Sequence, residues 1–151
     1  MRYSYSLSAI LFFLLTIIPA CSESDPVTPQ EEHYDAIGVV LRSSGTQEAS
    51  ILRGVTADTL DASAGSLGEL LEVFFYDENE HIIEPPTDPN KTLSWEIGNR
   101  QLLELQQDSG REGRFEFRLK GLQSGATTIE LFIMHEGHAD YRSGKIPVSI
   151  H

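Results

Sequence analysis

Arg114-Phe115-Glu116-Phe117-Arg118-Leu119-Lys120 is the stretch of sequence that decides the fold class. Apolar and charged residues alternate along it, so Phe115, Phe117 and Leu119 project to one side of an extended chain. A period of two is typical of a β-strand with one face on a core and the other in water. The sequence therefore predicts a strand over 114–120.

The same alternation recurs on both sides of this strand. It is found in five further segments, centred on 37–41, 71–75, 93–97, 129–133 and 146–150. The segments are separated by residues that favour turns, at 43–45, 77–80, 108–110 and 123–125. About seven to eight short strands in one domain predict an all-β sandwich of two sheets. We expect Trp95 to lie between the sheets.

Two stretches interrupt the strand pattern. Pro85, Pro86 and Pro89 cannot donate ladder hydrogen bonds, so this stretch is expected to be a loop or a sheet edge. The segment Ala62–Glu72 contains two glycines within its first seven residues. Glycine disfavours helix, so a loop is expected there rather than a helical turn.

Within this pattern, the stretch Leu71–Ile133 resembles a bacterial immunoglobulin-like (Big-type) domain. The matching pieces are Val73–Asn79, Leu93–Ile97 and Gly125–Ile129. The chain departs from the family at Glu80, where the family often has glycine. The resemblance implies a surface-displayed module for adhesion or spacing, and it implies no catalytic residues.

The N-terminus has the features of an export signal. A positive residue, Arg2, precedes an apolar run of about ten residues, which is too short for a permanent transmembrane helix. The run ends in Ile18-Pro19-Ala20-Cys21, which resembles the lipobox of bacterial lipoproteins. This resemblance implies that residues 1–20 are removed and that Cys21 is acylated. The alternative is an ordinary cleaved signal followed by a free thiol.

A polar segment follows the lipobox. Residues 21–33 are rich in Ser, Glu, Asp and Pro, so they are expected to form a flexible tether that joins the lipid to a domain over 34–151. The predicted location is the bacterial cell envelope, with the membrane bound through the lipid. Because Ser22 stands where sorted lipoproteins of the inner membrane carry Asp, the resemblance favours the outer membrane, on either its periplasmic or its surface face.

Charge limits the class of partner. The formal net charge is −12, and such a surface repels nucleic acid. No nucleophile elbow, phosphate loop or EF-hand occurs in the sequence, so no enzymatic activity is expected. A protein or glycan partner is compatible with these features. The aromatic residues Phe74, Tyr76 and Phe132 alternate away from the expected core, so they either mark a partner surface or are covered by neighbours.

One cluster of residues has the chemistry of a metal site. His135 and His138 are three apart across a glycine, and Asp140 or Glu136 can complete a ligand set or orient a ring. His33, just before the first strand, is a candidate third imidazole. Neutral imidazoles suit Zn²⁺ or Cu²⁺.

Two functional hypotheses therefore stand side by side. The first is a lipid-anchored envelope module without catalytic activity, for adhesion, partner binding or spacing. The second is a zinc- or copper-binding lipoprotein that uses the His135–His138 turn. The competing interpretation of that turn is a polar loop with no ligand. Proximity of the two imidazoles in the folded protein distinguishes the hypotheses.

Overall fold

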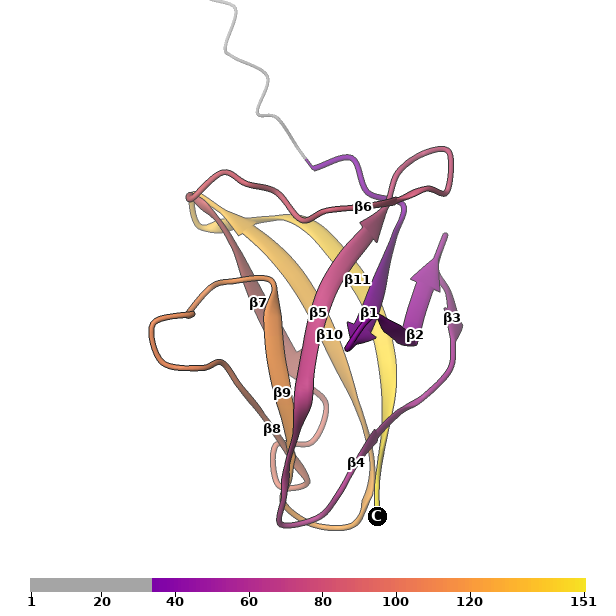
Figure 1. The fold of residues 1–151 in the computed structure, drawn as a ribbon, viewed down its shortest axis with the longest axis vertical. Helices are drawn as coiled ribbons and strands as arrows, with labels where there is room; N and C mark the ends of the chain where they lie inside the picture. The colour runs from indigo at the N-terminus through magenta and orange to yellow at the C-terminus, as the bar shows by residue number, and fades with distance from the viewer. Residues whose placement is uncertain (1–33) are drawn as a thin grey trace, which may run out of the picture. The chain divides into compact units, whose positions relative to one another are not determined.

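A computed structural model describes residues 34–151 of the chain, and these residues form strands and loops only (Figure 1). The strands, in chain order, are β1 (Gly38–Ser43), β2 (Thr46–Leu52), β3 (Val55–Ala57), β4 (Leu60–Ala62), β5 (Leu67–Tyr76), β6 (Ile82–Ile83), β7 (Lys91–Ile97), β8 (Leu103–Gln106), β9 (Glu116–Gly121), β10 (Gly125–His135) and β11 (His138–Ile150). Within this described part, no helix is long and apolar enough to cross a membrane.

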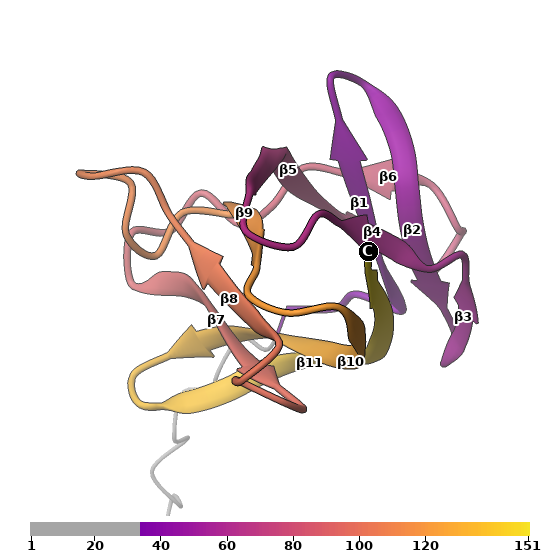
Figure 2. The same cartoon turned by 90° about the horizontal axis from the view of Figure 1, so that it is seen from below.

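The strands form two sheets. The larger has the order β3-β2-β1-β5-β9-β8, with β6 paired to β5, and the smaller has the order β4-β11-β10-β7. Neighbouring strands run antiparallel, except that β4 runs parallel to β11. Figure 2 shows β7, β10 and β11 on one side and β1, β2 and β5 on the other. The predicted all-β sandwich is confirmed: eight strands have four or more residues, and the remaining three of the described part have only two or three.

The core lies between the inward faces of the two sheets. Its largest fully buried side chains include Phe75 and Phe117 from the larger sheet and Ile129, Leu131 and Ile133 from the smaller one. Each such side chain contributes roughly 1.5–3 kcal/mol through burial. The period-two pattern therefore identified the residues that hold the sheets together.

Trp95 lies between the sheets as predicted, at the margin of the core. It belongs to β7 of the smaller sheet, and its ring lies 6.2 Å from that of Phe117 in the larger sheet. The indole is partly buried and packs against the core cluster. It therefore bridges the two layers.

The loop expected over Ala62–Glu72 is wrong for most of its length. Strand β5 already begins at Leu67, and its pairing with β9 shifts register between Leu67 and Leu70. Gly68 lies in this irregular stretch, where an added Cβ would approach the carbonyl oxygen of Leu119 to 3.2 Å. The glycine therefore marks a β-bulge with close backbone approach instead of a loop. The prolines at 85, 86 and 89 do lie outside strands, as predicted.

Two of the three outward-facing aromatic rings are covered by arginines. The guanidinium carbon of Arg42 lies 5.2 Å from the centre of the Phe74 ring, and that of Arg142 lies 4.9 Å from the Phe132 ring. Phe132 is only 5% exposed. Cation–π stacking thus accounts for these two aromatic residues.

Gly38, at the start of β1, provides a test of the packing between neighbouring strands. An added Cβ there would lie 2.2 Å from the carbonyl oxygen of Ile51, which is backbone and cannot rotate away. We expect Gly38→Ala to lower the free energy of unfolding by about 1–3 kcal/mol or more, as overpacking does. Denaturant unfolding measures the change. Thr46→Ala, at an exposed position of β2, is the control and should change stability by less than about 0.5 kcal/mol. Equal stability of both variants and wild type would contradict this packing.

Candidate metal centre

The two histidines of the predicted cluster are brought together by a tight hairpin. Strand β10 ends at His135 and β11 begins at His138, and the two residues are paired across the strands. The turn residues Glu136 and Gly137 both have positive φ angles, of 48° and 89°. This is the signature of a two-residue type I′ turn, whose twist matches that of the strands. The imidazole ring centres are 5.9 Å apart.

Asp140 joins the histidines through an irregularity in the same hairpin. Ile133 pairs with Tyr141 and Met134 with Ala139, so Asp140 is the additional residue of a bulge. A bulge changes the direction of a side chain. The Asp140 carboxylate places Oδ1 3.0 Å from Nε2 of His138 and Oδ2 3.5 Å from Nδ1 of His135. One donor atom from each of the three residues lies within 4.8 Å of the others.

Lys91 is the fourth member of the cluster. It is the first residue of β7 and stands in register with His135. Its Nζ atom lies 3.0 Å from Oδ2 of Asp140, and the two side chains are only 9% and 1% exposed. A carboxylate this deeply buried needs a compensating positive charge. Lys91 provides that charge in the metal-free protein.

The cluster closes one end of the core. His135 follows the buried Ile133 by two residues, and Lys91 precedes the buried Leu93 by two. Side chains two apart in a strand share a face, so the cluster continues the inward face of the smaller sheet. Figure 1 shows the β10–β11 hairpin beside the segment that leads from β6 into β7. The site is therefore supported by regular strands and a packed core, which favours fixed geometry.

Asp140 remains ionised at neutral pH. Burial raises the pKa of its carboxyl group, but the hydrogen bond and charge of Lys91, with smaller effects from His135 and His138, lower it further than burial raises it. The net result is a pKa below the usual value of Asp. The cluster therefore presents an anionic oxygen together with two imidazole nitrogens.

Two imidazoles and a carboxylate are a ligand set that proteins use for zinc, with a fourth position left to water. Tetrahedral coordination with bonds of about 2.0–2.2 Å brings donor atoms to within about 3.5 Å of one another. To bind an ion, the donor atoms, which now lie within 4.8 Å of one another, would have to move closer together by side-chain rotation. His138, whose side chain is 36% exposed, has room for such a rotation. The same donors suit Cu²⁺.

The structure places the sequence-derived candidates unequally. His135, His138 and Asp140 come together, whereas Glu136 is exposed in the turn and stands apart from the donor cluster. Between the two carboxylates left open by the sequence, the geometry thus favours Asp140. His33 and Cys21 lie outside the described residues.

Lys91 was missed by the sequence analysis. It lies 44 positions from His135 in the chain, and only the pairing of β7 with β10 brings the two side by side. A lone lysine at the start of a strand carries no signal of this role. Strand order and register were both needed to find it.

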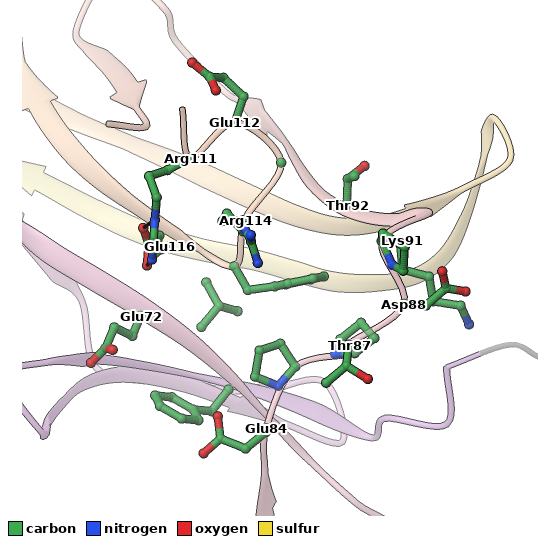
Figure 3. A pocket seen from close by; sticks show the side chains of 17 residues that line it. Glu72, Glu84, Thr87, Asp88, Lys91, Thr92, Arg111, Glu112, Arg114 and Glu116 are labelled. Atoms are coloured by element: carbon green, nitrogen blue, oxygen red, sulfur yellow. Dashed lines mark hydrogen bonds and ion pairs between the residues drawn. The ribbon is translucent and has the colours of Figure 1, made fainter. Parts of the chain in front are cut away.

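A cavity of about 620 Å³ adjoins the cluster on the side of β7. It lies between the proline-containing segment 84–89 and the loop 111–116, and Lys91 forms part of its wall. Figure 3 shows Lys91, Asp88 and Thr92 grouped at one end, away from Arg111 and Glu116. Arg111 donates two hydrogen bonds to the carboxylate of Glu116, so these two opposite charges on the far wall are already paired.

Comparisons with known proteins show a distant structural similarity and no family. No protein-family model matches the chain, and no curated protein matches it. Among solved structures, domains 4 and 5 of the S-layer protein SbsC are similar, with a TM-score of 0.42 and 14% sequence identity. That match covers 62% of this chain, and the chain spans about half the length of the S-layer structure, 47%.

Proposed function

We propose that the chain is a lipid-anchored, non-catalytic module of the bacterial cell envelope that binds Zn²⁺ or Cu²⁺ through His135, His138 and Asp140. The observation that carries the metal part is the convergence of one donor atom from each residue within 4.8 Å. The hairpin turn and the bulge bring these three residues together in the folded chain.

The chemistry of the cluster favours a transition metal over a hard cation. Calcium requires six to eight oxygen ligands, whereas this cluster offers two imidazoles and one carboxylate. Imidazole suits zinc and copper. The acidic surface, with a net charge of −12 for the chain, adds a general attraction for cations.

The anchoring part of the proposal rests on the lipobox-like Ile18–Cys21 sequence. A lipid on Cys21 followed by a polar tether would hold the sandwich near a membrane surface. In that position the protein would present its metal site to the envelope space. Binding of a protein or glycan partner is a further role that we propose for the same module.

Metal binding is tested by calorimetry with Zn²⁺ and Cu²⁺. We expect saturable binding of one ion by the wild type, and a loss of affinity of at least about tenfold in His138→Ala, because an imidazole ligand is removed. His151→Ala is the matched control, since His151 lies 2.9 Å from the exposed Asp61 and belongs to no donor cluster of the described residues. It should bind like the wild type.

An absence of saturable heat in the wild type would refute the metal part. The cluster would then be a buried polar network, and the function left to the chain would be that of an adhesion, partner-binding or spacing module.

Lipid anchoring is tested separately, by metabolic labelling with a fatty-acid analogue in bacteria. We expect the wild-type chain to carry the label and to sediment with membranes, and Cys21→Ser to lose both properties, because Cys21 is the only cysteine of the chain. A label that persists in Cys21→Ser would mean that the lipobox was misidentified.

A further inference from the structure

We infer that Lys91 is a built-in competitor for the metal: its ammonium group neutralises Asp140 in the metal-free protein and is displaced into the adjoining cavity when an ion binds. The inference rests on the proposed metal-binding function and names the residue that sets the affinity of that site.

The competition follows from the geometry of one carboxylate. Nζ of Lys91 lies 3.0 Å from Oδ2 of Asp140, and the same oxygen faces Nδ1 of His135 at 3.5 Å. A metal held by His135 and by Oδ2 of Asp140 would therefore have to take the position of the Lys91 ammonium group and replace its positive charge. Two cations cannot share one buried carboxylate oxygen without strong repulsion.

The structure provides a place for the displaced ammonium group. Lys91 lines the cavity of about 620 Å³, whose wall also carries the carboxylates of Glu84 and Asp88. Asp88 is three residues away on the same turn, and its carbonyl oxygen accepts a hydrogen bond from the Lys91 backbone N–H at 3.0 Å. Figure 3 shows Lys91 and Asp88 at the same end of the cavity. Rotation of the flexible lysine stem thus moves the charge towards other acids with the backbone in place.

This arrangement selects which ions can enter. An ion that binds the carboxylate alone makes only the interaction that the Lys91 ammonium group already makes, so it does not displace the lysine. An ion that also binds both imidazoles gains two bonds, and this gain is what displaces Lys91. We therefore assign to Lys91 a role in specificity, as a residue that excludes hard cations such as Mg²⁺ and Ca²⁺ and lowers the affinity for Zn²⁺.

The first test compares Zn²⁺ binding by the full-length chain in detergent, as wild type, Lys91→Met and Lys120→Met. We expect Lys91→Met to bind Zn²⁺ about 10- to 100-fold more tightly, the range over which groups next to a metal's ligands change its affinity. Lys120→Met is the matched control, because Lys120 pairs with Glu104 at 3.4 Å on an exposed surface. It should bind like the wild type.

Each outcome separates this inference from the proposed function. Binding by wild type with unchanged or weaker binding by Lys91→Met would overturn the role of Lys91 and leave the metal site standing. No binding by either chain would overturn the metal site itself.

The second test needs no variant and remains decisive if Lys91→Met fails to fold. The wild-type chain is treated briefly with an amine-acetylating reagent, once in the presence of a chelator and once in the presence of Zn²⁺. Mass spectrometry then measures the acetylated fraction of each of the three lysines, Lys91, Lys120 and Lys145. We expect acetylation of Lys91 to rise at least about fivefold with Zn²⁺, because its amine leaves a buried ion pair for an open cavity. The other two lysines should not change. Unchanged protection of Lys91 in the Zn²⁺-loaded protein would overturn the displacement.

Discussion

Phe75→Ala is expected to destabilise the protein by about 3–5 kcal/mol, the usual range for removing a fully buried phenylalanine. The Phe75 side chain is 1% exposed. Its ring makes edge-on contacts with Tyr34, Phe115 and Tyr141, at centroid distances of 5.1, 5.9 and 5.3 Å. Truncation leaves a cavity bounded by three aromatic rings from different segments, which cannot all move to fill it.

Chemical denaturation monitored by circular dichroism measures this loss, and the neighbouring residue provides a control. Phe74 points to the outer face of the same strand, where Arg42 covers it. We expect Phe74→Ala to lose no more than about 1–2 kcal/mol, because only partial burial and a cation–π contact disappear. Equal losses at the two positions would mean that β5 does not direct Phe75 into the core.

The Phe75 variant also links the core to the candidate metal site. Tyr141 packs against Phe75 and directly follows Asp140 in the bulge of β11. Loss of the phenylalanine ring removes support from the segment that orients the carboxylate. We therefore expect weaker Zn²⁺ binding by Phe75→Ala, even under conditions where the variant is folded.

The fold was predictable from sequence because it depends on a local pattern. The alternation in 114–120 needs only the two-sided geometry of an extended chain, and Phe117 and Leu119 are indeed buried. The alternation does not predict burial correctly where both faces of a strand are covered. Val40 is fully buried although it alternates with Val39 and Leu41, because it is in register with the arginine-covered Phe74. Gly68 was misread for a related reason, since a glycine in a bulge resembles a glycine in a loop.

The candidate site was predictable only in the part that a hairpin makes local. His135, His138 and Asp140 lie within six residues, and a turn of two residues brings them together. Lys91 comes from another strand, and no sequence pattern reports which strands become neighbours. The ionisation of Asp140 depends on Lys91, so the electrostatics of the site could not be derived without the register of β7 on β10.

Asp140→Ala is expected to destabilise the metal-free protein by about 1–3 kcal/mol, because it removes the carboxylate that pairs with the Lys91 ammonium group, which must then turn towards the acids of the adjoining cavity. The measurement is denaturant unfolding at pH 7 in the presence of a chelator. A loss below about 1 kcal/mol would show that the pair is effectively solvated and that its burial has little energetic weight.

The double variant Lys91→Met/Asp140→Leu distinguishes two contributions to stability. One is the cost of leaving a charge without its partner, and the other is the net contribution of the ion pair to the free energy of unfolding. Replacing both partners by apolar side chains removes the unpaired charge, so we expect it to recover most of the stability lost in Asp140→Ala. The pH dependence provides an independent check. Since the pKa of Asp140 is lower in the folded than in the unfolded chain, its stabilising effect is complete above the unfolded pKa of about 3.9 and is lost as the pH falls through the folded value. Below about pH 4 the wild type should therefore lose more stability than the double variant, which has no carboxylate at position 140. A gap that stays constant down to pH 2 would mean that the carboxylate is not held in its ionised form by Lys91.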